Sequence, residues 1–363
     1  MDYPVISADS HITEPGDTYS KHIDPKFRDR APYIERQEGV GDLFVIPGMK
    51  MPIPMGLVAA AGKRPEDISL KGTFEEWHRG GWDPEARLAD QDRDGIAAEI
   101  LYPTVGMPLC NHEDADYKKA CFDAYNLWIT EYCEPHPERL LGVGQTAMRS
   151  PEEGIEDLRH IKDLGLRGVM LPGHPTQGDY DSPAYDAFWE AAVDLGLPLS
   201  FHILTTRDRY TQRGSVLNFA VCTIRANQDI ISMLIYGGVF ERHPRLRVVC
   251  AEADAGWVPH FMYRMDHAYQ RHRHWLETSK LSKLPSEYFS NNIYVTFQDD
   301  FAATHLTELS PTKRLMWASD FPHNDGTYPN TREVISKLTN GMSAEDRTRI
   351  IGANVTELYG LAS

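Results

Sequence analysis

The chain has 363 residues, 41% of them hydrophobic, and a formal net charge of −16, which is typical of a globular protein with a large core. The acidic charge argues against nucleic acid or an anionic membrane surface as partner, and neither a signal peptide nor an apolar run near the ~20 residues of a membrane span is evident. The five cysteines are odd in number and form no Cys-x-x-Cys pair, so we expect reduced thiols in a cytoplasmic protein.

The first predicted strand, residues 5–8, leads directly into two polar residues, Asp9 and His11. Its residues are apolar or small and show no helical period. Side chains two positions apart on a strand lie on the same side, about 6–7 Å apart along the backbone. A carboxylate and an imidazole placed in this way can bind one divalent metal ion. The same short motif is also common as a turn with a capping carboxylate, so the pair needs support from elsewhere in the chain.

A long polar and proline-rich connection follows over residues 15–85, which we interpret as a lid or an inserted subdomain. Residues 39–48 predict a short hairpin. Trp77, Trp82 and the Met-rich segment 49–55 either line a pocket or anchor the insertion to the rest of the protein.

From residue 84 onward, strands and helices alternate regularly. Further strands are predicted at 96–103, 140–148, 168–172, 197–202, 246–252, 293–297 and 315–320. Helices are predicted at 84–93, 117–133, 151–164, 185–195, 215–242, 258–276, 301–309, 331–339 and 344–359. Strands that alternate with helices imply a parallel sheet, and eight such units imply a closed (β/α)8 TIM barrel. We see no linker, so we expect a single domain over 1–363, with a long insertion after strand 1 and C-terminal helices outside the barrel.

Active sites of such barrels lie at the C-terminal ends of the strands. Strand one ends in Asp9 and His11, strand five in His202, and strand eight in Asp320. Alone, His202 would be interpreted as a core histidine and Asp320 as a helix cap or an ion-pair partner. Charged groups at the inner mouth of a barrel must be paired or must hold a metal. Because four such groups converge there, we predict a mononuclear metal site.

Other polar residues at the same face are candidates for substrate contact. His174 follows strand four, and His323 follows Asp320 by three residues. Arg207, in the loop after His202, is placed to pair with a substrate carboxylate. Strand six ends in Glu252, which is followed by Asp254.

These motifs resemble the amidohydrolase superfamily, in particular the branch that includes aminocarboxymuconate-semialdehyde decarboxylase and γ-resorcylate decarboxylase. The resemblance covers nearly the whole chain. The stretches that carry it are Asp9-Ser10-His11-Ile12-Thr13-Glu14-Pro15, Phe201-His202, Gly256-Trp257-Val258-Pro259 and Ala318-Ser319-Asp320-Phe321-Pro322-His323.

The resemblance implies one divalent metal ion, zinc or manganese, held by Asp9, His11, His202 and Asp320. It also implies a small-molecule substrate and a homo-oligomer, since relatives are commonly dimers. Two positions depart from the family pattern. Asp9 stands where many relatives have His or Glu, and Glu252 stands where relatives often have a catalytic histidine. Glu252 could therefore act as a base, as the hydrogen-bond partner of a metal-bound water, or as an added ligand.

Two chemistries fit this set of residues. In a non-oxidative decarboxylase, Asp320 would protonate the carbon that loses CO2; in a hydrolase, it would accept a proton from a metal-activated water. The resemblance favours decarboxylation of a small aromatic or unsaturated carboxylic acid, with hydrolysis of a C–N, lactone or C–C bond as the alternative. A barrel without turnover is the third interpretation, and the complete ligand set argues against it.

Overall fold

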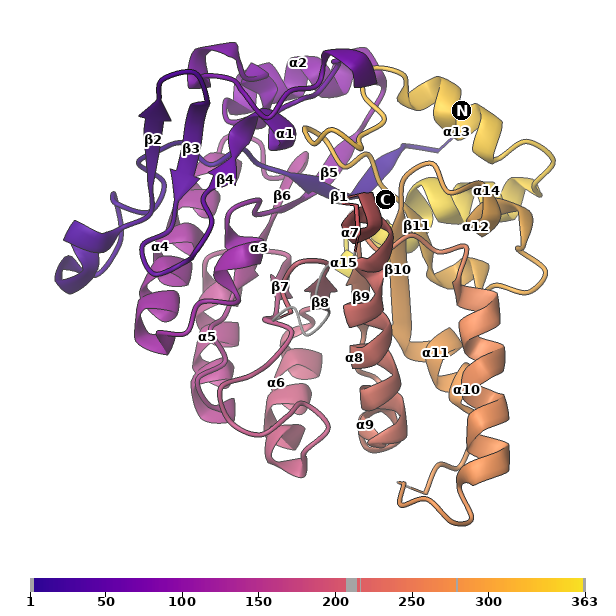
Figure 1. Ribbon diagram of the computed structural model, residues 1–363. Coiled ribbons are helices and arrows are strands. Elements are labelled where there is room, and N and C mark those ends of the chain that lie inside the picture. Colours follow the sequence, from indigo (N-terminus) through magenta and orange to yellow (C-terminus); the bar gives the residue numbers. More distant parts are fainter. Residues whose placement is uncertain (1–2, 207–213, 216, 279, 362–363) are drawn as a thin grey trace.

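The structure is a computed structural model that describes residues 3–206, 214–215, 217–278 and 280–361. Eight of its strands form one sheet whose neighbours follow the order of the chain (Figure 1). They are β1 (Ile6–His11), β5 (Ala98–Tyr102), β6 (Leu140–Gln145), β7 (Gly168–Met170), β8 (Leu199–His202), β9 (Val248–Ala251), β10 (Ile293–Phe297) and β11 (Leu315–Trp317). All the paired neighbours run parallel. This arrangement confirms the predicted (β/α)8 barrel.

The two edges of the sheet, β1 and β11, meet through the backbone just beyond β11. The Asp320 N–H donates to the Asp9 carbonyl (3.0 Å), and the His11 N–H donates to the Phe321 carbonyl (2.6 Å). Among the described residues, no strand ladder joins these two edges. The seam of the barrel therefore lies between the segments that carry Asp9, His11 and Asp320.

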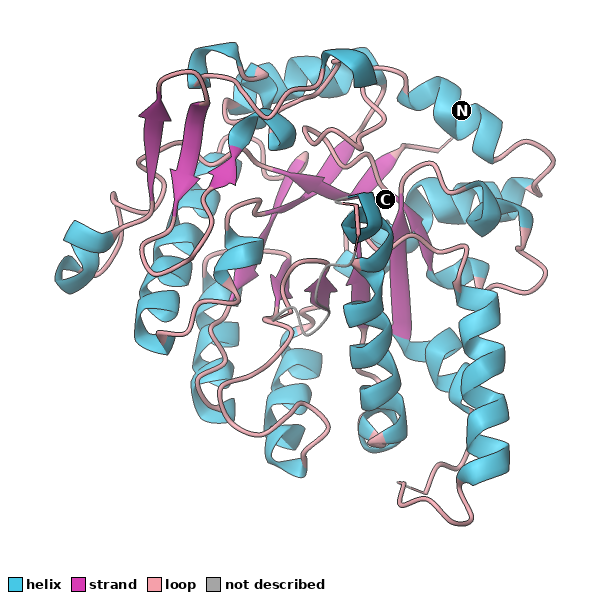
Figure 2. Ribbon diagram, in the orientation of Figure 1, coloured by secondary structure: helices cyan, strands magenta, loops and turns pink. Residues whose placement is uncertain are grey.

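Helices surround the strands (Figures 1 and 2). They are α1 (Met55–Val58), α2 (Pro84–Asp94), α3 (Gly106–Leu109), α4 (Ala115–Cys133), α5 (Pro151–Asp163), α6 (Asp186–Leu195), α7 (Leu217–Cys222), α8 (Ile224–Tyr236), α9 (Val239–Arg242), α10 (Val258–His272), α11 (Pro285–Asn292), α12 (Phe301–His305), α13 (Thr331–Leu338), α14 (Ala344–Thr348) and α15 (Asn354–Tyr359). Helix α5 begins at a Ser150 cap whose hydroxyl accepts the Glu153 N–H. None of these helices is long and apolar enough to cross a membrane, a finding limited to the described residues.

The long helical region predicted over about 215–242 is present as three consecutive helices, α7, α8 and α9. Gly238, with a φ of 75°, takes the left-handed conformation that separates α8 from α9. Helix α11 was not predicted. The segment 344–359 is interrupted by a π-helical turn, Arg349–Ala353.

The insertion contains a small antiparallel sheet of β2 (Tyr33–Gln37), β3 (Gly41–Val45) and β4 (Ile53–Pro54). The predicted hairpin at 39–48 is therefore misplaced. Gly39 has a φ of 74°, which puts it in the turn between β2 and β3 and not in a strand. Trp77 is buried in the hydrophobic cluster that also includes barrel residues, and its ring packs against Phe74 within the insertion.

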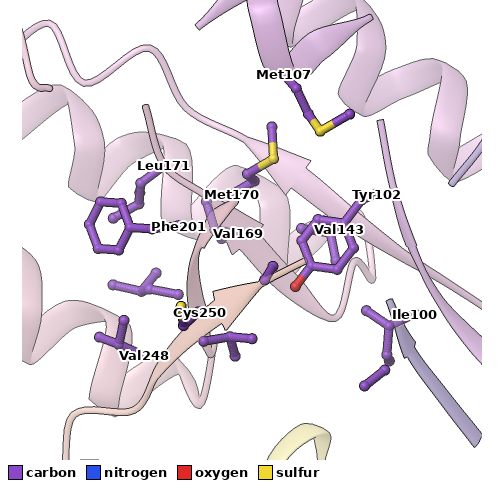
Figure 3. Packing of buried hydrophobic residues seen from close by; sticks show 14 of the residues in the cluster. Ile100, Tyr102, Met107, Val143, Val169, Met170, Leu171, Phe201, Val248 and Cys250 are labelled. Carbon is purple, nitrogen blue, oxygen red and sulfur yellow. The ribbon is translucent and has the colours of Figure 1, made fainter. Parts of the chain in front are cut away.

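The barrel wall is built from apolar side chains of consecutive strands (Figure 3). Ile100 and Val143 come from β5 and β6, and Val169, Phe201 and Val248 come from β7, β8 and β9; all are buried. Each fully buried side chain of this kind contributes about 1.5–3 kcal/mol relative to exposure. The five cysteines are free, so hydrophobic packing, without disulfides, holds the strand ends in place.

Candidate metal centre

Side chains from the ends of four strands converge on His11. Its Nε2 lies 3.1 Å from Glu252 Oε2 and 3.5 Å from both Asp9 Oδ1 and Asp320 Oδ1. His202 Nε2 lies 3.5 Å from Asp9 Oδ1 and 3.3 Å from Glu252 Oε2. The structure thus brings together the four residues predicted to bind metal, and it places Glu252 directly between the two imidazoles. We call Asp9, His11, His202, Glu252 and Asp320 the carboxylate–imidazole ring.

Unusual backbone conformations turn these residues inward. Glu252 and Asp320 have φ values of 50° and 52°, in the left-handed region that non-glycine residues rarely adopt. This conformation costs on the order of 1–3 kcal/mol at each residue and is concentrated at functional sites. Glu252 directly follows β9, which ends at Ala251, one residue before its predicted end, whereas β11 ends at Trp317, three residues before Asp320.

The ring is buried and carries several carboxyl groups in close contact. Asp9, His11, His202 and Asp320 are fully buried, and the Glu252 side chain is 16% exposed. Burial, followed by the nearby Asp9 charge, raises the pKa of Asp320 well above its ordinary value. Burial and then the Asp320 charge raise the pKa of Glu252, whereas burial and the neighbouring imidazoles lower the pKa of His11. The charged forms of Asp320, Glu252 and His11 are therefore disfavoured unless a cation compensates the carboxylates. His202 differs, because burial lowers its pKa but the nearby Asp9 charge raises it above the ordinary value.

The donor atoms fit a divalent cation. Asp9 Oδ1 and His202 Nε2 are buried, and neither has a hydrogen-bond partner among the described residues. The Nδ1–H groups of His11 and His202 donate to the carbonyls of Pro103 and Ile203, both at 3.1 Å, which leaves each Nε2 lone pair facing the ring. Imidazole nitrogens together with carboxylate oxygens suit zinc and manganese.

Ligand atoms in two overlapping groups lie within 4.8 Å of one another, namely Asp9–His11–His202 and His11–Glu252–Asp320–His323. His11 belongs to both groups, so an ion bound by His11 would lie near the donor atoms of either group.

His323 packs against the carboxylate–imidazole ring, and both of its nitrogens have a partner. Its side chain stacks on His11 with ring centroids 3.9 Å apart, and its Nδ1 lies 3.0 Å from Asp320 Oδ1. The Thr104 hydroxyl donates to the Ile12 carbonyl, so it accepts from His323 Nε2–H at 2.9 Å. These contacts favour a role for His323 in orienting Asp320 over the predicted contact with substrate.

The other predicted substrate contacts lie away from the ring or outside the described residues. His174, in the loop after β7, lines a cavity of about 290 Å³ together with His112, Lys118 and Thr205. Thr205 donates to the His202 carbonyl (2.8 Å), so this cavity adjoins the strand end that carries His202. Arg207 lies outside the described residues.

Thr296 is a ring neighbour that the sequence analysis missed. Its hydroxyl donates to Asp9 Oδ2 at 2.9 Å and accepts the Glu252 N–H at 2.8 Å. Thr296 thereby links Asp9 of β1 to Glu252, the residue that directly follows β9. The available signal was a polar residue near the C-terminal end of an apolar strand, the same signal that identified His202.

The chain matches a known protein family over nearly its whole length. A family model described as Amidohydrolase matches residues 9–361. Over 298 residues the chain is 25% identical to the 2-amino-3-carboxymuconate-6-semialdehyde decarboxylase of Dictyostelium discoideum, and the match covers 79% of each protein.

Two solved structures share the fold over nearly their full lengths. An amidohydrolase from Mycobacterium avium subsp. paratuberculosis superposes with a TM-score of 0.80 at 21% identity, covering 100% of this chain and 99% of that one. A 5-carboxyvanillate decarboxylase from Novosphingobium aromaticivorans, complexed with manganese and 4-hydroxy-3-methoxy-5-nitrobenzoic acid, superposes with a TM-score of 0.69 at 23% identity, covering 99% and 97%.

Proposed function

Because this chain belongs to the amidohydrolase family, we propose that it is a metal-dependent, non-oxidative decarboxylase of a small aromatic or unsaturated carboxylic acid. The observation that carries the proposal is the buried carboxylate–imidazole ring at the C-terminal ends of the barrel strands. The names of two similar proteins, both decarboxylases of unsaturated or aromatic acids, support this choice of reaction. Hydrolysis of a C–N, lactone or C–C bond is the second candidate, supported by the high TM-score to a protein named as an amidohydrolase.

In this proposal Asp9, His11, His202 and Asp320 hold one divalent ion, zinc or manganese. When bound there, such an ion would supply positive charge to polarise the oxygen atoms of the acid. Asp320 holds a proton in a buried position and delivers it to the carbon that bears the carboxylate. The bond from that carbon to the carboxylate breaks, CO2 leaves, the new C–H bond keeps the proton, and Asp320 is left as a carboxylate. His323, in contact with Asp320, keeps the carboxyl group aimed at the reacting carbon.

The reaction is tested by metal analysis together with a screen of hydroxybenzoates and related acids for CO2 release. We expect about one zinc or manganese ion per chain and CO2 release from at least one acid. Metal without CO2 release from any acid would favour the hydrolase, and cyclic amides, lactones and ring-cleavage products would then be screened. Absence of metal, even after reconstitution with zinc or manganese, would refute the proposed function.

Removal of the metal is expected to abolish turnover and to lower the melting temperature. Without a cation, the buried carboxylates of the ring lose their compensating charge, and a ligand that binds only the folded state stabilises it. The measurements are CO2 release and thermal unfolding after dialysis against a chelator, and again after zinc or manganese is added back. Full activity of the metal-free protein would contradict the proposal.

Glu252→Gln is expected to reduce kcat by roughly 100-fold or more, within the range for loss of a general acid or base. The amide has the size of the carboxyl group but cannot transfer a proton, and Glu252 Oε2 contacts both His11 and His202. The measurements are kcat, bound metal and melting temperature. Lowered metal occupancy would assign Glu252 as an added ligand, whereas a lowered melting temperature with unchanged kcat would make it structural.

The proposed enzyme is a cytoplasmic homodimer. The free cysteines support a reducing compartment. Helix α7 supports self-association, because Leu217 and Val221 are 78% and 73% exposed and the helix has no buried residue. Light scattering on the purified protein is expected to give the mass of two chains, and the mass of one chain would rule out the dimer.

A further inference from the structure

The barrel seam is held by groups that lie outside the carboxylate–imidazole ring. Because Asp320 adopts a left-handed conformation and β11 ends at Trp317, β1 and β11 lack a regular ladder where the ring residues begin. Asp9 and His11 lie on one side of the seam and Asp320 lies on the other. Their relative position thus depends on a few backbone hydrogen bonds and on buried side chains.

Arg87 of α2 reaches across this seam from behind the ring. The side chain is fully buried. One guanidinium nitrogen, Nη1, donates to the His11 carbonyl at 2.5 Å, and Nη2 donates to the Phe321 carbonyl at 3.5 Å. The guanidinium carbon also lies 4.5 Å from the centre of the Phe321 ring. Arg87 therefore holds the backbone of His11 and of the residue that directly follows Asp320.

Glu99 of β5 fixes the guanidinium in this position. Its Oε2 accepts from Arg87 Nε at 2.6 Å and from Gln91 Nε2 at 2.7 Å, and its Oε1 accepts from the Ser10 hydroxyl at 3.0 Å. Ser10 in turn contacts the Ser319 hydroxyl at 2.8 Å, on the other side of the seam. A buried ion pair costs free energy unless its remaining hydrogen-bonding groups are satisfied. Here the remaining groups of Arg87 and Glu99 form hydrogen bonds to residues on the two sides of the seam.

We propose that Arg87 is a positioning residue for the metal site, because its guanidinium joins the carbonyls of His11 and Phe321 across the barrel seam. This inference rests on the proposed function, since it concerns affinity for the metal. Arg87 itself touches neither metal nor substrate. It maintains the distance between Asp9 and His11 on β1 and Asp320 after β11, and a planar guanidinium can contact both carbonyls and Glu99 at once, which a lysine ammonium cannot.

The test compares Arg87→Met and Arg87→Lys with a matched control, Arg139→Met. Arg139 also binds two main-chain carbonyls, those of Ile96 and Ala97, both at 3.1 Å, but it does so where the chain enters β5, at the opposite end of the barrel. We expect Arg87→Met to weaken metal binding by roughly 10- to 100-fold, as for loss of a group that orients metal ligands. Arg87→Lys is expected to give an intermediate loss, and Arg139→Met to leave the metal affinity unchanged.

Metal affinity is measured by competition with a chelator, and the site geometry by the visible absorption of the cobalt-substituted proteins. If Arg87→Met does not fold, the metal affinity and the cobalt spectrum of Arg87→Lys test the proposal instead. Arg87 variants that lose melting temperature but keep the wild-type metal affinity and cobalt spectrum would overturn the inference while leaving the proposed function intact. A wild-type protein that binds no metal would overturn both.

Discussion

The Asp320→Asn variant is expected to keep its metal and to lose about 1,000-fold or more of its turnover, within the range for removal of a general acid. Asparagine retains the size of the side chain and one carbonyl oxygen for the metal, but its amide cannot hold and deliver a proton. Asp320 is fully buried, so solvent water has no direct access with which to replace the lost proton donor. The measurements are metal content and CO2 release in a single turnover.

Asp325→Asn is the matched control for this experiment. Asp325 acts electrostatically on Asp320 and Glu252, but it lies at an exposed position and outside the carboxylate–imidazole ring. We expect its neutralisation to change kcat by only a few-fold. Full activity of Asp320→Asn would remove Asp320 from the proposed mechanism, and equal losses in the two variants would show that local charge, and not proton transfer, is responsible.

The His202→Ala variant is expected to weaken metal binding by more than about 100-fold, because removal of a direct ligand should cost at least as much as removal of a group that merely orients one. His202 Nε2 is buried without a hydrogen-bond partner in the described structure, and its Nδ1–H is held by the Ile203 carbonyl. The imidazole is thus oriented toward the ring before any ion binds. Elemental analysis and chelator competition measure the effect.

His174→Ala is the matched control for His202. His174 follows a barrel strand on the same face, but it is absent from both groups of potential metal ligands among the described residues. Its replacement is expected to leave the metal content unchanged. Wild-type metal stoichiometry and affinity in His202→Ala would exclude that residue from the ligand set.

The alternation of strands and helices was predictable because the barrel strands are short apolar runs, and several of them end in polar residues. His202, for example, follows Leu199 and Phe201, and a buried strand that ends in a histidine at the active face of a barrel is a strong local signal. The spacing of Asp9 and His11 likewise predicted that their side chains would lie together. These signals act over a few residues, so they are present in the sequence itself.

The contacts that orient the ring depend on residues distant in the chain. Thr296 binds Asp9 across 287 positions, and Arg87 holds the backbone of His11 and Phe321. Thr296 is a single threonine in a strand, and Arg87 is an arginine in a charged helix. The neighbouring sequence does not distinguish either of them from a residue with an ordinary packing role.

The sequence by itself determined the barrel, the order of its strands and, as predicted metal ligands, four of the five residues that meet in the carboxylate–imidazole ring. The tertiary structure decided where Glu252 points, which nitrogen of His323 faces Asp320, and how the seam between β1 and β11 is closed. The reason is that Glu252 and Asp320 adopt left-handed backbone conformations that their residue types do not favour. Such conformations persist only where the surrounding structure imposes them, so they emerge when the strands are assembled.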